Sequence, residues 1–443
     1  MFSNKDLRKL IIPLVIEQLL AVTIGMADTV MVSSCGEAAV SGISLVDSIN
    51  FLLITLFSSL ATGGAVIAFQ YIGRGDHKSA SLAAKQLFYA SLALSAVLGV
   101  IAVFFRKPVL NMVFGSIEAD VMAHAQIYFL LSAISYPFLA VYNAGAALFR
   151  SMGDSRTTML ISILMNTINI VGNAILIYGF QMAAAGAATA SLVSRAVGAI
   201  IITVLLLNPH RIIFYDKLHK PEIHLSMLKS ILQIGVPNGL ENSIFQIGKI
   251  LVASIVSGFG TISITANAVA GNLASLQVIP GMALGMAMIT VVGQCIGAKD
   301  YEAVKKYTKK LMLITYGVVW AMTLLMLLFS KQILSFYSLS EETTTMTMEV
   351  FIVHGICAVI VWPLAFALPN ALRAANDVRF TMIVSLLSMW IFRIGFSYIL
   401  AIYFNMGILG TWIAMCIDWF CRGACFVIRF ARGKWKNISF IDN

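Results

Sequence analysis

Four oxygen-bearing side chains lie inside long apolar segments in the first half of the sequence: Asp28, Asn169, Asn173 and Ser191. Asn169 and Asn173 are four residues apart, so a helix would place them on one face. We expect all four within about ten residues of the same end of their segments, where helices rising about 1.5 Å per residue bring them to one depth. One carboxylate, two amides and a hydroxyl suit Na+, and the carboxylate can bind H+ instead. This pattern favours a cation site; the alternative is that the asparagines only join helices by hydrogen bonds.

The segments that carry these residues belong to a membrane protein. Hydrophobic residues make up 59% of the chain, charged residues 11%, and the mean hydropathy is +0.90. Soluble domains carry about 25% charged residues. We expect an all-α membrane protein with twelve spanning helices. The predicted spans are 9–33, 43–70, 84–105, 123–148, 158–179, 184–207, 229–257, 265–295, 311–330, 346–371, 380–404 and 408–430.

The sequence contains one long unit twice. At an offset of 224, five residues recur in order and without a gap: Pro13, Glu17, Gly36, Gln70 and Asp76 return as Pro237, Glu241, Gly260, Gln294 and Asp300. At an offset of 223, Arg150, Asp154, Arg156 and Met159 return as Arg373, Asp377, Arg379 and Met382. Duplication on this scale in a membrane chain is typical of transporters with two pseudosymmetric halves. We expect an N-lobe at 1–208, a cytoplasmic linker at 209–227 and a C-lobe at 228–443 with a short basic tail.

Basic residues predict the orientation. With both termini in the cytoplasm, 24 of the 30 Lys and Arg residues fall in inner segments, including Arg422 and Arg429 near the C-terminus. The outer loops hold only Arg106, Lys107 and Lys331, and the spans hold Arg195, Lys249 and Arg393. This bias follows the positive-inside rule. Each half has six spans, so both halves insert with the same orientation.

Further ionisable residues lie within the predicted spans, where a charge is costly and marks a functional candidate. These additional candidates are Glu17, Asp47, Glu241, Lys249, His354, Arg393 and Asp418. Arg393 and Asp418 share a depth and are predicted to pair. Lys249 and His354 lie at similar depths, so the set is either a structural network or one in which Lys249 titrates against Glu241 during a transport cycle. A lone His among apolar neighbours is more often a hydrogen-bonded core residue than a proton carrier.

Two prolines, Pro13 and Pro237, occupy equivalent places in the first span of each half. Proline frees a backbone carbonyl and allows a helix to bend. These residues are hinge candidates for alternating access, and a static kink is the alternative.

Several motifs resemble the multidrug and toxic compound extrusion (MATE) transporters. They are MADTVMV, LFRSMGDSRTTM, NTINIVGNAILIYG and GAATAS, and the likeness extends over nearly the whole chain. The resemblance implies two six-helix lobes in a V shape that alternate between outward- and inward-open states. It also implies that Asp28, Asn169, Asn173 and Ser191 form the cation site of the archaeal and bacterial members. Those members often carry Asp where Asn173 stands, and they expel cationic amphipathic compounds in exchange for Na+ or H+.

These observations predict a secondary active antiporter, monomeric, in the inner membrane of a bacterium. It would export small amphipathic, cationic drugs or metabolites in exchange for Na+ or H+, with no cofactor beyond the coupling ion and no nucleic-acid partner. The alternatives are a flippase for a lipid-linked precursor or polysaccharide and an exporter of one dedicated metabolite. An enzyme is not expected, because no nucleophile stands at a workable spacing from a base.

Overall fold

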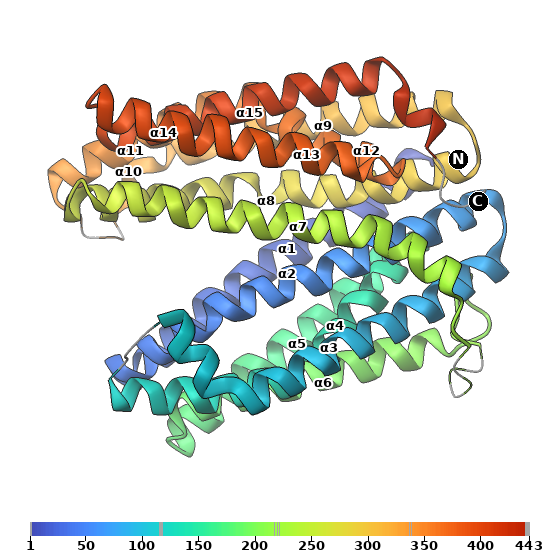
Figure 1. Ribbon diagram of the computed structural model, residues 1–443, viewed down its shortest axis with the longest axis horizontal. Helices are drawn as coiled ribbons and strands as arrows, with labels where there is room; N and C mark the ends of the chain where they lie inside the picture. Colours follow the sequence, from blue (N-terminus) through green and yellow to red (C-terminus); the bar gives the residue numbers. More distant parts are fainter. Residues whose placement is uncertain are drawn as a thin grey trace. The chain divides into compact units, whose positions relative to one another are not determined.

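The computed structural model describes residues 2–114, 118–216, 218, 220, 222–335, 337 and 339–438; the side chains of residues 23–30 lie outside this description. The described part of the chain is helical throughout and contains no strand. It forms two compact units, Met1–Gly239 and Leu240–Asn443, each built from helices that lie side by side (Figure 1).

The first unit contains six long helices and the start of a seventh. They are α1 (Asn4–Ser33), α2 (Glu37–Arg74), α3 (His77–Phe114), α4 (Ala119–Ser151), α5 (Ser155–Asn173) with a π-helical continuation (Ala174–Gly179), and α6 (Ala183–Leu206). Helix α7 (Leu225–Ser257) crosses the boundary between the units. Within the first unit, α4 packs against α2, α3 and α6, and α5 packs against α1 and α6.

The second unit repeats this order with more interruptions. It contains α8 (Thr261–Gly297), α9 (Tyr301–Leu328), α10 (Ser330–Ser335), α11 (Glu341–Ile360), α12 (Leu368–Ala374), α13 (Val378–Ser388), α14 (Phe396–Tyr398) and α15 (Gly407–Ala431). Three π-helical segments lie between them: Pro363–Ala367, Met389–Gly395 and Ile399–Tyr403. A 3-10 turn (Lys434–Asn437) follows α15. Helix α8 packs against α9, α11 and α12, and α15 packs against α11 and α13.

Eleven helices or helix series among the described residues are long and apolar enough to cross a membrane. They correspond to the second through twelfth predicted spans, and α1 covers the first predicted span with 30 residues. The tenth span is interrupted after Ile360. Pro363 explains the interruption, because it lacks the backbone N–H that would continue the helix. Helices α1 and α7 run without interruption through Pro13 and Pro237.

The duplication is visible in local geometry. Gly36 precedes α2 with φ 94°, and Gly260 precedes α8 with φ 88°. Side chains are rarely tolerated at such angles, so both repeats need glycine there. Gly186 lies against Leu176, and Gly410, 224 residues on, lies against the backbone of Leu400 and Ala401.

One residue is therefore extra in the second repeat between Met382 and Leu400. The offset is 223 at Met159 and Met382, and it returns to 224 at Leu176 and Leu400. The π-helical segment Met389–Gly395 lies in this interval. A π-helical turn takes up one residue more than an α-helical turn, so it accommodates the insertion locally.

The first part of α7 lies against α2. A Cβ on Gly63 would come within 2.5 Å of the carbonyl oxygen of Ile231, so glycine permits this close backbone approach. This contact explains why the first unit extends to Gly239, beyond the segment 209–227 that was expected to divide the lobes.

Candidate functional site

The predicted cation-site residues on α5 and α6 lie together. The Nδ2 of Asn169 donates to the Oγ of Ser191 at 3.0 Å, which joins α5 to α6. The Nδ2 of Asn173 donates to the Oδ1 of Asn169 at 3.4 Å. Asn169 and Asn173 are both buried. Three of the four predicted side chains thus meet in one hydrogen-bonded chain.

The fourth residue, Asp28, lies in helix α1, and its side chain falls outside the described residues. Helix α1 packs against α5, the helix that carries both asparagines. The described side chains offer hydroxyl and amide oxygens, which are suitable ligands for Na+. Their mutual hydrogen bonds also match the structural alternative, in which the asparagines hold α5 against α6. Among the described residues, no group of three or more His, Cys, Asp or Glu could hold a metal ion.

Glu17 has partners at the other end of the same unit. Its Oε1 lies 3.4 Å from the Nη1 of Arg150 at the end of α4, and its Oε2 accepts a hydrogen bond of 3.0 Å from Thr158 on α5. The carboxylate therefore connects α1, α4 and α5. Its side chain is only 12% exposed, so the ion pair is largely shielded from solvent.

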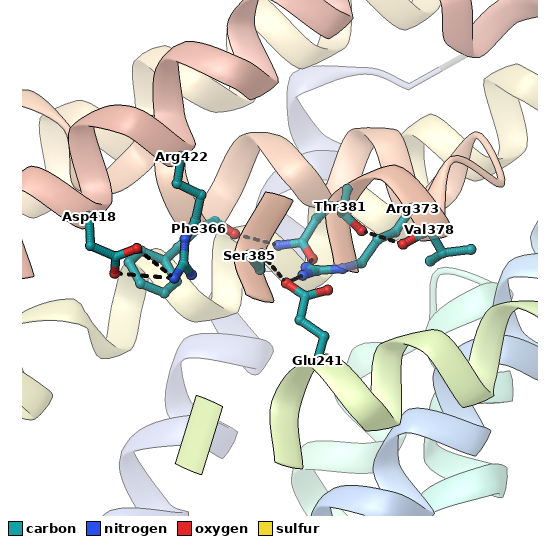
Figure 2. A network of polar contacts seen from close by, with 9 residues as sticks. Glu241, Phe366, Arg373, Val378, Thr381, Ser385, Asp418 and Arg422 are labelled. Carbon is teal, nitrogen blue, oxygen red and sulfur yellow. Dashed lines mark hydrogen bonds and ion pairs between the residues drawn. The ribbon is translucent and has the colours of Figure 1, made fainter. Parts of the chain in front are cut away.

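Glu241 repeats this arrangement in the second unit (Figure 2). Its Oε1 accepts hydrogen bonds from Arg373 at 2.7 Å and from Ser385 at 2.6 Å. Asn370 accepts a bond of 2.8 Å from the same guanidinium. Arg373 and Ser385 therefore occupy the carboxylate of Glu241, and titration of Lys249 against Glu241 during a transport cycle stays a prediction. Neither arginine partner was predicted, although Arg150 and Arg373 recur at an offset of 223, next to the offset of 224 between the two glutamates.

Asp47 and Arg195 do not form an ion pair in the described structure. Asp47 accepts hydrogen bonds from Asn50 at 3.2 Å and from Tyr128 at 3.0 Å. Arg195 donates to the hydroxyl of Ser135 on α4 at 2.7 Å. Each residue therefore joins its helix to α4 through neutral partners.

Asp418 on α15 is the centre of the charged network in the second unit. Arg422, one turn further along the same helix, donates to both carboxylate oxygens at 3.1 and 3.2 Å. Ser388 also donates to this carboxylate. Arg393 lies 3.9 Å away, within ion-pair distance and beyond hydrogen-bond distance. The predicted contact of Arg393 with Asp418 is present, but Arg422 is the stronger partner.

Arg422 is buried within α15. It was counted among the basic residues of the inner segments, and its side chain is only 3% exposed. Hydropathy could not show this, because the carboxylate one helical turn away stabilises a guanidinium that would otherwise be too costly to bury. Figure 2 shows Arg422 directed toward Asp418, with the ring of Phe366 beside it.

His354 does not join this network by a hydrogen bond. Its Nδ1 is 3.0 Å from the Oε1 of Gln277, whose amide nitrogen donates to Thr323. The imidazole also packs against Trp412 and Trp419, with ring centroids 5.6 and 5.3 Å away. His354 is therefore a satisfied core residue of the second unit.

Comparison with known proteins identifies the family. The MatE family model matches residues 13–175 and again 237–399, the same offset of 224 that the sequence repeat shows. The chain belongs to the MatE family. This MatE chain is 26% identical to the "Uncharacterized transporter YisQ" of Bacillus subtilis, over 96% of this chain and 93% of that protein. It is also 26% identical to the "Probable multidrug resistance protein NorM" of Thermotoga maritima, over 98% and 93% of the two chains.

The solved structures agree with the assignment of the MatE fold. One, described as the outward-facing conformation of a multidrug resistance MATE family transporter, superposes with a TM-score of 0.89. It shares 21% sequence identity and covers 98% of this chain and 97% of that one. The prediction of an all-helical membrane transporter built from two homologous halves is confirmed, and membership of a transporter family supports the expectation that the chain is not an enzyme.

Proposed function

We propose that this MatE protein is a secondary active antiporter that exports small amphipathic molecules in exchange for Na+ or H+ entering from outside. The observation that supports this proposal is the hydrogen-bonded chain of Ser191, Asn169 and Asn173 on α5 and α6. Buried amides and a hydroxyl beside a carboxylate-bearing helix supply oxygen ligands for a cation. The named relatives, among them a probable multidrug resistance protein, agree with an export role.

Asp28 is proposed as the coupling residue. Coupling requires that ion binding and substrate binding favour opposite conformations, so that each entering cation promotes release of substrate outside. Asp28 can be protonated, or it can be ionised and bind Na+ with the oxygens of Asn169, Asn173 and Ser191. Pro13 and Pro237 are proposed as the places where α1 and α7 bend during this cycle. Both termini are proposed to lie in the cytoplasm of a bacterial cell, and the protein to act as a monomer.

Transport by the purified protein in liposomes tests this function. Asp28→Asn keeps the size and hydrogen-bonding capacity of the side chain but removes its charge. We expect it to abolish accumulation of a fluorescent substrate driven by an imposed Na+ or pH gradient. Asp120→Asn is the matched control, because Asp120 is exposed in the first turn of α4. Full gradient-driven transport by Asp28→Asn would move the coupling site elsewhere, with Glu17 as the next candidate.

A further inference from the structure

Three cations surround one aromatic ring in the second unit. The Nζ of Lys249 lies 5.2 Å from the ring centroid of Phe245, and the guanidinium carbons of Arg393 and Arg422 lie 5.5 and 5.4 Å from the same centroid. We call Lys249, Arg393 and Arg422 the cation cluster. They come from α7, from the π-helical segment Met389–Gly395 and from α15, so three separate elements place positive charge at one point.

The cation cluster is not neutralised by the described part of the chain. Asp418 is the carboxylate that contacts it, and this residue is bonded twice to Arg422. Lys249 has no carboxylate within ion-pair distance among the described residues, and Arg393 has only Asp418 at 3.9 Å. Three cations with one carboxylate leave two positive charges uncompensated. Charge at this depth in a membrane protein is costly, which favours binding of an anion.

Hydrogen-bond donors are also available in the cluster. Within the described residues, neither Lys249 nor Arg393 makes a hydrogen bond, and the Nε atoms of Arg393 and Arg422 are buried without an acceptor. The side chain of Arg393 is 11% exposed, while Lys249 is exposed. Lys249 thus opens the cluster to the surface of the unit, and Arg393 lies deeper. A guanidinium and an ammonium arranged in this way match the oxygens of a carboxylate, phosphate or sulfonate.

Aromatic side chains border the cluster. The ring of Phe245 lies edge-on to Phe366 at 6.1 Å, and Phe366 contacts Trp362 at 5.3 Å and Trp419 at 5.5 Å. These rings provide a surface on which an aromatic ligand can pack. An anion-binding group beside such a surface suits an organic anion better than an inorganic one.

The repeat shows that this charge is specific to the second unit. At the offset of 224 that relates Leu400 to Leu176, Arg393 corresponds to Asn169. Asn169 is the central residue of the hydrogen-bonded chain in the first unit. At the same offset, Met415 stands for Ser191 and Arg422 for Gly198. The place that offers oxygens to a cation in one repeat therefore carries fixed positive charge in the other.

We propose that the cation cluster binds the acidic group of an aromatic organic anion, and that such anions are substrates of this protein. The inference rests on the proposed export function only where it calls these anions substrates, since their binding requires no transport. A free aromatic anion and the headgroup of an anionic lipid offer the same acidic oxygens to the cluster, and the experiment separates these two sources.

Equilibrium binding to the purified full-length protein in nanodiscs of zwitterionic lipid tests the proposal. The probes are carboxyfluorescein, an aromatic anion, and ethidium, an aromatic cation, each followed by fluorescence anisotropy. We expect Lys249→Gln and Arg393→Gln each to weaken carboxyfluorescein binding at least about tenfold, because each removes a charge-assisted contact. Lys249→Arg should retain binding, and ethidium should not bind more tightly than carboxyfluorescein. Lys306→Gln is the matched control, since Lys306 is exposed on α9.

Three outcomes would overturn the proposal: no binding of carboxyfluorescein to the wild-type protein, equal binding to Lys249→Gln, or tighter binding of ethidium that the substitutions leave unchanged. Lys249 is exposed and makes no hydrogen bond with another described residue, so we expect Lys249→Gln to fold even if Arg393→Gln does not. Repeating the titration with phosphatidylglycerol in the nanodiscs identifies the source. Competition by this lipid assigns the site to a headgroup phosphate, and unchanged affinity assigns it to a free organic anion.

Failure of the proposed function is distinguishable from failure of this inference. The two assays report different properties, since gradient-driven transport requires ion coupling whereas equilibrium binding in nanodiscs requires only the anion site. If Asp28→Asn transports normally while Lys249→Gln loses binding, the coupling site is wrong and the anion site stands. If Asp28→Asn loses transport but carboxyfluorescein never binds, the antiport proposal stands and the anion site is wrong.

Discussion

The guanidinium of Arg373 lies 2.7 Å from the carboxylate of Glu241 and joins α12 to α7 within the second unit. Both side chains are largely buried, at 13% and 7% exposure. The first unit holds the equivalent pair of Arg150 and Glu17 at 3.4 Å. The same kind of ion pair therefore joins equivalent helices in both copies of the repeat.

Arg373→Gln should destabilise the protein by about 3–5 kcal/mol, because it leaves the buried charge of Glu241 unpaired. The double variant Glu241→Gln with Arg373→Gln should lose much less, since neither charge is then stranded. Thermal unfolding in detergent measures both changes. Lys305→Gln is the control for removal of a positive charge, because the pair of Lys305 with Glu302 is exposed and should contribute nothing measurable. Additive losses from the two single substitutions would show that Glu241 and Arg373 are not coupled.

Asp418 should be coupled more strongly to Arg422 than to Arg393. The first contact consists of two hydrogen bonds at 3.1 and 3.2 Å, and the second is a single approach of 3.9 Å. Double-mutant cycles with Asp418→Asn, Arg422→Gln and Arg393→Gln measure the two coupling energies. We expect the cycle through Arg422 to give the larger coupling energy. A larger value through Arg393 would contradict the geometry of the network.

Gly36→Ala and Gly260→Ala should each cost about 1–3 kcal/mol, because positive φ combined with extended ψ is a conformation that only glycine adopts readily. Both residues have open space around the missing Cβ, so the loss would come from the backbone and not from a clash. Gly317→Ala is the matched control: it lies inside α9, also with open space, at ordinary helical angles. Unfolding temperatures of the three variants decide the matter, and an equal effect of all three would refute the conformational argument.

Asn173→Asp should make the thermal stability of the protein depend more strongly on Na+. A second carboxylate next to the proposed site binds Na+ more tightly, and a ligand that binds only the folded state raises its stability. The measurement is the shift in unfolding temperature between NaCl and KCl at equal ionic strength. Asn111→Asp is the control, because Asn111 is exposed at the end of α3. If Asn173→Asp responds to the two salts as the wild type does, these residues do not bind Na+.

Cysteine labelling tests the proposed orientation. In a chain without its six native cysteines, single cysteines at Glu118 and Glu341 should react with an impermeant maleimide added to intact cells. Cysteines at Arg74 and Lys305 should react only after the membrane is opened. All four positions are exposed, so a difference in labelling reports the side of the membrane and not burial. The reverse pattern would invert the topology.

Hydropathy and the repeat were sufficient to predict the fold. Each apolar run is long enough to indicate a spanning helix by itself. Matched polar residues such as Glu17 and Glu241 show the duplication, although most residues of the chain are apolar. The interruption near Pro363 was not predicted, because a proline does not always end a helix. Pro137 in the first repeat lies inside an uninterrupted α4. Whether a proline ends a helix depends on the packing around it, which the sequence does not specify.

The polar contacts were predicted less completely, and for a different physical reason. Spacing along a helix predicts depth and face, which is why Asn169, Asn173 and Ser191 could be grouped. It does not predict which of several charges at one depth will pair, because that depends on rotation of each helix about its axis. The spacing therefore did not show that the partner of Glu241 is Arg373. The shared offset of Arg150 and Arg373 was the available signal.

The extra residue near the π-helical segment Met389–Gly395 has a consequence for how the two copies diverged. An insertion in a regular α-helix would turn every later side chain by roughly 100°, given 3.6 residues per turn. When one wide turn takes up the extra residue, the later contacts are kept: Leu400 still lies next to Gly410, as Leu176 lies next to Gly186. The second copy could thus change around Arg393 while the C-terminal end of this helix series kept the packing of the first copy. A duplicated gene could in this way acquire a new polar specificity in one half without loss of the common scaffold.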